Sequence, residues 1–103
     1  NGNLKVNGTA TSSWGSTWTV GDIIGIALDL DNNKIYFSKN GTYQASGNPS
    51  TAANGVTITA ADSTSTGVYR FGFGDNNSTG TSTFQYNFGS GFFGTTAVAS
   101  ANA

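Results

Sequence analysis

The chain has 103 residues, enough for one small domain, and more than half of them are Gly, Ser, Thr or Asn. Charged residues make up only 9%, and the formal net charge is −1, so the chain lacks the clustered positive charge that nucleic acid or anionic membrane surfaces attract. Because Cys, His, Met and Glu are all absent, disulfides, Cys-based metal sites and most acid–base or nucleophilic catalysts are excluded.

Residues 22–31 form the first predicted strand, with a period of two. Ile24, Ile26, Leu28 and Leu30 fall on one face, while the other face carries mainly small residues. No helical stripe of useful length competes with this pattern, and no apolar stretch approaches the roughly 20 residues of a membrane-spanning helix. The segment is therefore predicted to be a strand with one strongly apolar face.

A meander is predicted to follow. Residues 31–34 are suited to a turn because Asn tolerates left-handed backbone angles, and residues 35–39 then return as the partner strand. Asn40-Gly41 is the strongest short hairpin signal, so a third strand is expected to start near Thr42.

Two aromatic rows are predicted after a polar loop, a short strand over residues 56–60 and a second loop at 61–67. The first row lies on a predicted strand over residues 68–74 and the second on a predicted strand over 81–88, and in both rows the aromatic residues alternate with other residues. We expect the two rows to face each other in the core. Their members are Tyr69, Phe71 and Phe73 in the first row and Phe84, Tyr86 and Phe88 in the second.

The fold class follows from the spacing of these elements. Short alternating strands separated by turn signals every 8 to 12 residues or so are typical of sandwiches and barrels. The chain is therefore predicted to be all-β, with an antiparallel β-sandwich as its architecture and no second domain.

The first hairpin also carries a family resemblance. It consists of a strand that begins with Gly-Asp, a turn, and a second strand that ends in Lys-Asn-Gly. This arrangement is similar to the signature hairpin of SPRY domains. Trp14 and Trp18 lie where that family often has an aromatic residue before the first of these strands. The stretches concerned are Gly21-Asp22-Ile23-Ile24-Gly25-Ile26-Ala27-Leu28-Asp29-Leu30-Asp31 and Ile35-Tyr36-Phe37-Ser38-Lys39-Asn40-Gly41.

The resemblance implies a concanavalin-like β-sandwich over residues 1–103, a single SPRY-like domain without enzymatic activity whose loops hold peptide or protein partners. SPRY domains usually have strands before the part matched here, and they continue past the motif that is Asn87-Phe88-Gly89 in this chain. We therefore expect a fragment of a longer protein, incomplete at both ends, with open sheet edges and uncovered apolar area. The polar composition and the ending of residues 88–94 resemble SPRY-like modules in structural proteins of tailed bacteriophages.

A calcium loop is the first alternative for the turn. Asp29, Asp31 and Asn33 have the spacing of its first three ligands, but Lys34 replaces the glycine that follows and Asn40 stands where a glutamate is needed. A hairpin turn explains the same residues with no missing ligands, so we predict the turn and no metal or cofactor. A shallower calcium site at Asp75 and Asn76 stays open.

Binding residues are sought among the aromatic side chains outside the two rows. Trp14, Trp18 and Tyr43 could stack on sugar rings or anchor a protein partner, and Arg70 could donate hydrogen bonds to a ligand. The alternative is structural, with the three rings plugging the ends of the sandwich and Arg70 solvated on an outer face. No catalytic residue is predicted, because the five Asp are scattered and no Ser or Thr has a visible base.

Three functions remain, and we favour the first. It is a structural or adhesive module of a phage virion, such as a capsid decoration, tail or fibre component, assembling with copies of itself or other virion proteins. The second is a SPRY-type protein-binding or peptide-binding domain of a cellular protein, and the third is a lectin-like module for surface glycans. The expected location is the virion or the extracellular space, with no nucleic-acid or membrane partner.

Overall fold

The computed structural model describes residues 2–74, 79–93 and 96–97. Its paired strands all run antiparallel, and the helical elements among these residues are 3₁₀ turns of three residues each. The chain is therefore all-β, as the period of two predicts. The strands are β1 (Leu4–Val6), β2 (Thr9–Thr11), β3 (Ile24–Asp29), β4 (Lys34–Lys39), β5 (Thr42–Tyr43), β6 (Val56–Thr57), β7 (Phe92–Phe93) and β8 (Thr96–Ala97), and the 3₁₀ turns are η1 (Gln44–Ser46), η2 (Pro49–Thr51) and η3 (Ala61–Ser63).

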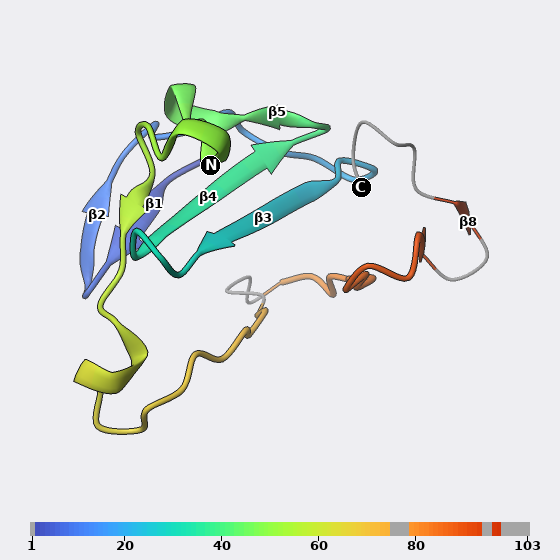
Figure 1. Cartoon of the computed structure of the whole chain (residues 1–103). Helices are drawn as coiled ribbons and strands as arrows, with labels where there is room; N and C mark the ends of the chain where they lie inside the picture. The colour runs from blue at the N-terminus through green and yellow to red at the C-terminus, as the bar shows by residue number, and fades with distance from the viewer. Residues whose placement is uncertain (1, 75–78, 94–95, 98–103) are drawn as a thin grey trace.

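A four-stranded sheet is built around β4 (Figure 1). β3 pairs with β4 over its whole length, from Ile24 opposite Lys39 to Asp29 opposite Lys34. On the other side of β4, β5 pairs with one end of the strand and β6 with the other. The predicted hairpin and the third strand starting at Thr42 are confirmed, whereas β3 and β6 are shorter than the predicted 22–31 and 56–60. Within the described ranges β3 pairs only with β4, so its outer edge is open.

The two turns of this meander have the backbone angles that their residues favour. Asn33 has a φ of 50°, and Asn40 and Gly41 have φ values of 49° and 82°. Positive φ at two successive residues belongs to the turn type whose twist matches a two-residue hairpin. Asn40-Gly41 therefore forms the two-residue hairpin turn that the sequence predicts.

The buried part of the sheet lies on the face with the small residues. Tyr36 is 2% exposed and is the one large side chain fully buried among the described residues. It lies opposite Ala27 on β3, and the segment 44–55, with η1 and η2, crosses over its ring. A Cβ at Gly47 or Gly55 would come within 3.1 Å or 2.6 Å of that ring, so glycine is what allows the backbone to approach it.

The strongly apolar face is only partly covered. Trp14 packs edge-on against Phe37, with ring centroids 5.9 Å apart, yet Ile24 and Ile26 keep 38% and 36% of their surface exposed, and Leu30 beyond them 56%. These exposed fractions agree with the expectation of uncovered apolar area on this sheet. A strand pattern shows which residues share a face, but a separate segment has to return over that face to bury it.

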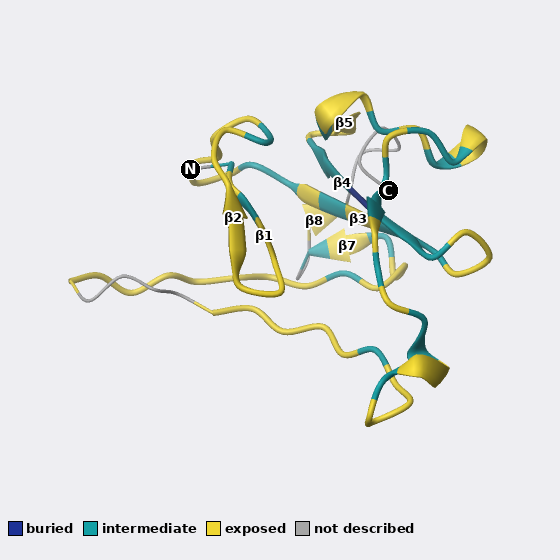
Figure 2. Ribbon diagram, turned by 90° about the vertical axis from the view of Figure 1, so that its left-hand side faces the viewer, coloured by how far each residue is buried: buried dark blue, intermediate teal, exposed yellow. Residues whose placement is uncertain are grey.

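The two aromatic rows do not form the predicted strands. Within the described part of residues 68–88 there is no β-ladder, and the row side chains other than Tyr69 are exposed, so the prediction of an aromatic core is wrong. The segments run out from the sheet and back again (Figure 2). We call residues 68–74 together with 79–88 the tongue.

The rows do face each other, as predicted. Ring centroids lie 6.2 Å apart for Phe71 and Phe88, and 4.9 Å apart for Phe73 and Tyr86. From the first pair to the second, the residue number rises by two in one row and falls by two in the other. The Phe73–Phe84 contact, with centroids 6.4 Å apart, is a diagonal pair. This is the side-chain register of an antiparallel hairpin.

Two small hairpins were not predicted. β1 pairs with β2 through a turn at Asn7 and Gly8, whose φ values are 47° and 85°, and β7 pairs with β8. The first hairpin has the same Asn-Gly signal as the turn before β5, so that signal was available in the sequence.

Candidate functional site

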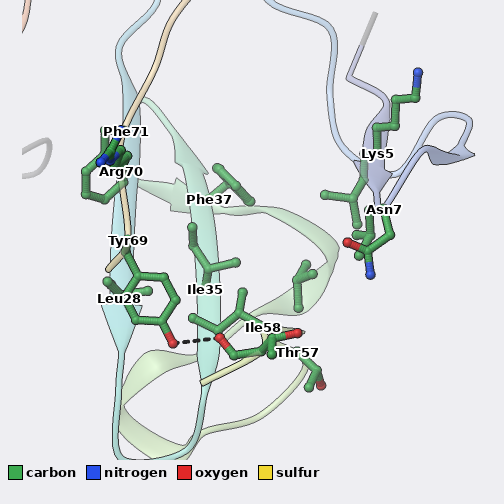
Figure 3. Close-up of a pocket in the computed structure, with 14 residues that line it drawn as sticks. Lys5, Asn7, Leu28, Ile35, Phe37, Thr57, Ile58, Tyr69, Arg70 and Phe71 are labelled. Atoms are coloured by element: carbon green, nitrogen blue, oxygen red, sulfur yellow. Dashed lines mark hydrogen bonds between the residues drawn. The ribbon is translucent and has the colours of Figure 1, made fainter. Parts of the chain in front are cut away.

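A hollow lined by described residues lies on the apolar face of the sheet. It encloses about 360 Å³ between the sheet, the β1 hairpin and the start of the tongue (Figure 3). Leu28, Ile35 and Phe37 form its floor, and Tyr69 and Phe71 stand at its side. An open, largely apolar concavity of this kind suits an apolar side chain or a packed partner better than a charged small molecule.

One hydrogen bond ties the tongue to this hollow. The Tyr69 hydroxyl donates to the carbonyl oxygen of Thr59 at 2.8 Å, so the ring is held beside β6 (Figure 3). The start of the tongue is therefore anchored, while the rings further along it lie beyond the hollow. A second, shallower groove of about 240 Å³ runs over the tongue itself, lined by Phe71, Phe73, Tyr86 and Phe88 with Gly72.

The structure separates the four candidate binding residues. Trp14 lies against Phe37, and Tyr43 packs edge-on against Tyr36 with centroids 6.3 Å apart. Trp18 is 52% exposed in the loop before β3. Arg70 is exposed and lines the hollow.

The four residues therefore do not make one site. Trp14 and Tyr43 contact opposite faces of the sheet, since Phe37 and Tyr36 are neighbours on β4. Each of the two rings packs edge-on against a ring of β4. The exposed fraction of the tongue rings is the feature that sequence reasoning missed, because alternation alone does not distinguish a buried row from an exposed one.

The Gly-Asp and Lys-Asn-Gly ends of the first hairpin meet in a polar clamp of Asp22, Lys39 and Asn40. The Lys39 ammonium lies 3.0 Å from the Asp22 carboxylate, and the Asn40 amide donates to the same carboxylate at 2.7 Å. The Asn40 side-chain oxygen accepts from the Ile23 N–H at 2.8 Å. Lys39 also donates to the carbonyl of Thr17 at 2.6 Å, which ties in the preceding loop.

The clamp has a strong effect on its carboxylate. Hydrogen bonds from the Thr19 N–H and the Asn40 amide, together with the Lys39 ammonium, hold the pKa of Asp22 well below its usual range. A carboxylate that stays ionised at neutral pH cannot serve as a general acid there. The residues that carry the SPRY resemblance thus join the two ends of a hairpin and have a structural role.

The calcium-loop residues form the predicted hairpin turn. The Asp29 carboxylate accepts from the Asn32 N–H at 3.0 Å and from the Asn32 amide at 2.8 Å, and these bonds lower the pKa of Asp29. Among the residues that the structure describes, no group of three His, Cys, Asp or Glu is placed to hold a metal ion. The other calcium candidate, Asp75 with Asn76, lies outside the described residues.

Comparisons with protein-family models, curated proteins and solved structures found no significant match to this chain. The SPRY resemblance therefore rests on sequence motifs alone. In the described part of the chain no helix has the length and apolarity to cross a bilayer.

Proposed function

We propose that this chain is a non-enzymatic SPRY-like module of a phage virion, a capsid decoration, tail or fibre component that works through protein–protein assembly or attachment to a host surface. In this proposal the tongue provides the layer that faces the apolar side of the sheet, which would complete a concanavalin-like sandwich. Such an assembly role requires an exposed apolar surface that another protein can cover.

The observation that carries the proposal is the amount of apolar surface left open beside so few charges. Ile24 and Ile26 on the sheet and Phe73 and Phe88 on the tongue keep 38%, 36%, 50% and 79% of their surface exposed. Soluble monomers rarely expose contiguous apolar patches above a few hundred Å². An interface centre is depleted of charge and rich in aromatic residues. The sheet surface is apolar, and the tongue is also rich in aromatic residues.

The chemistry of the chain supports a role without catalysis. It contains no His, Cys or Glu, and two of its five carboxylates, Asp22 and Asp29, are held ionised by hydrogen bonds. General acid–base catalysis needs a group that titrates near the working pH. Neither carboxylate meets that requirement.

Glycan binding is the second candidate, and one observation favours it. Trp18 presents about half of its surface in a loop, with the fully exposed Val20 two residues further on. A sugar ring can stack on such an indole. Glycan-array binding that is lost in Trp18→Ala and kept in Val20→Ser would support this function over assembly.

The test of the main proposal is chemical cross-linking with mass spectrometry on the native source of the chain, with the protein in its native assembly. We expect cross-links from Lys5, which lines the hollow on the apolar face, to virion proteins, including other copies of the chain. Cross-links confined to cellular signalling proteins would instead support the SPRY-type cellular role and refute the virion proposal.

A further inference from the structure

The hollow on the apolar face carries positive charge that no carboxylate in the described part of the chain neutralises. Lys5 and Arg70 line the hollow, and both are exposed (Figure 3). Neither side chain has an ion pair or a hydrogen bond among the described residues, and no carboxylate is among the residues that line the hollow. The other two cations, Lys34 and Lys39, each have an Asp opposite or beside them. The unpaired positive charge of the chain is therefore gathered at this apolar hollow.

The turn between β3 and β4 has the complementary character. Leu30 is 56% exposed, and its two neighbours in the chain are Asp29 and Asp31. The Asp29 carboxylate accepts hydrogen bonds from Asn32, whereas Asp31 is exposed and its side chain has no partner within the described ranges. Of the large apolar side chains that the described chain exposes, Leu30 is the one with a carboxylate residue on both sides. We call residues 29–31 the acidic knob.

The hollow has room for the apolar side chain of the knob. It encloses about 360 Å³ over an apolar floor, whereas a cavity of roughly 150 Å³ lined by apolar side chains already admits a benzene molecule. Leu30 does not line the hollow of its own chain, and the hydrogen bonds from Asn32 to Asp29 fix the turn that carries it. The knob that fills the hollow therefore has to come from another molecule.

We propose that copies of this chain assemble head to tail, with the acidic knob of one copy inserted into the hollow of the next. Leu30 then packs on the apolar floor, and Asp31 faces the two unpaired cations. This inference rests on the proposed assembly function and names one contact that carries it. Opposite charges on the two surfaces set the orientation of the contact and favour this partner over an uncharged one. Because knob and hollow are different surfaces, each copy can give a knob to one neighbour and take a knob from another.

Engineered cysteines detect this contact even if a single contact is weak, and the natural chain has no Cys to interfere. Leu30→Cys places a thiol, itself a small apolar group, on the knob. Val6→Cys places a thiol at the hollow, which Val6 lines while 39% exposed. Under mild oxidation we expect the mixed pair to form a disulfide-linked heterodimer roughly tenfold faster than a control pair, as read by intact-mass spectrometry. The control replaces Leu30→Cys by Val20→Cys, because Val20 is fully exposed and belongs to neither surface.

Charge reversal tests whether the two surfaces recognise each other. Asp31→Lys in the Leu30→Cys chain should slow the linking to the control rate. Lys5→Glu together with Arg70→Glu in the Val6→Cys chain should do the same. Mixing the two reversed chains should restore the fast rate, because opposite charges again face each other across the contact. A variant that only fails to fold cannot give this restoration, so the fourth mixture keeps the test independent of stability.

Equal linking rates for the knob and control cysteines would overturn the head-to-tail contact. Reversed chains that link no faster with each other than with unreversed chains would overturn it too, since charge would then play no part in the recognition. Neither result affects cross-links to other virion proteins in the native source, so the proposed assembly function can survive the loss of this inference.

Discussion

The backbone at Gly55 lies so close to the Tyr36 ring that a methyl group added at Gly55 should destabilise the protein. At Gly55 a Cβ would lie 2.6 Å from Cζ of Tyr36 and 2.8 Å from its hydroxyl oxygen, whereas carbon atoms pack at about 3.5–4.0 Å. The ring has little room to move, because it is 2% exposed and has the Tyr43 ring at 6.3 Å and the Gly47 backbone beside it.

Overpacking of this kind costs about 1–3 kcal/mol. The lower entropy of the unfolded chain offsets about 0.5 kcal/mol, because Gly55 does not have a left-handed φ that would strain alanine. We therefore expect Gly55→Ala to lower the free energy of unfolding by about 1–2 kcal/mol. Gly72→Ala is the matched control, since a Cβ there meets nothing within 4 Å, and it should be neutral or slightly stabilising.

Urea unfolding followed by Trp fluorescence gives the free energies, and a double-mutant cycle identifies the cause. Tyr36→Val removes the ring atoms that the new methyl group would meet. In that background Gly55→Ala should be neutral or slightly stabilising, with a coupling free energy of about 1–2 kcal/mol between the two sites. The steric explanation is refuted if Gly55→Ala costs the same in both backgrounds.

Three further predictions concern single groups. Because the folded state depresses the pKa of Asp22, the contribution of Asp22 to stability is present above the ordinary value of 3.8 and is lost as the pH falls below it. The acid-induced fall in melting temperature should therefore be shallower in Asp22→Asn than in the control Asp62→Asn, whose residue lies outside the clamp. Equal slopes in the two variants would contradict this prediction. The buried Tyr36 hydroxyl has no hydrogen-bond partner among the described residues, so Tyr36→Phe should keep or raise stability by up to about 1 kcal/mol in urea unfolding, and a clear loss would reveal a partner. Asn7 should deamidate several-fold faster than Asn40 in mildly alkaline buffer, as measured by peptide mass spectrometry. The Asn40 side-chain amide is fixed by hydrogen bonds at both its oxygen and its nitrogen, whereas the Asn7 turn belongs to an exposed two-stranded hairpin. Equal rates would show that the clamp does not protect Asn40.

Local signals explain why the first meander could be predicted. Alternation over β3 and the Asn residues at its turns act within a few residues of chain, so β3, β4 and the start of β5 are found where they are expected. The same reasoning, applied to Asn7 and Gly8, would have found the β1 hairpin.

The candidate site was predicted less well, because binding residues depend on what packs beside them. Trp14 and Tyr43 appear in the sequence as spare aromatic residues, yet each has a ring of β4 as its neighbour. Phe73 and Phe88 have the alternation of core residues and nevertheless lie exposed on the tongue. Neither outcome can be read from residue type or spacing, because both depend on contacts between distant segments.

The sequence by itself determined the all-β class, the strand positions of the meander and the partition of β3 and β4 into a small-residue face and an apolar face. Period-two alternation is a property of each strand alone, so it needs no tertiary contact. Only the tertiary structure decided which face is buried: the segment 44–55 returns over Tyr36, while Ile24 and Ile26 are left partly open. Burial requires a second surface to displace water from the first, and where that surface comes from depends on how the chain folds back on itself.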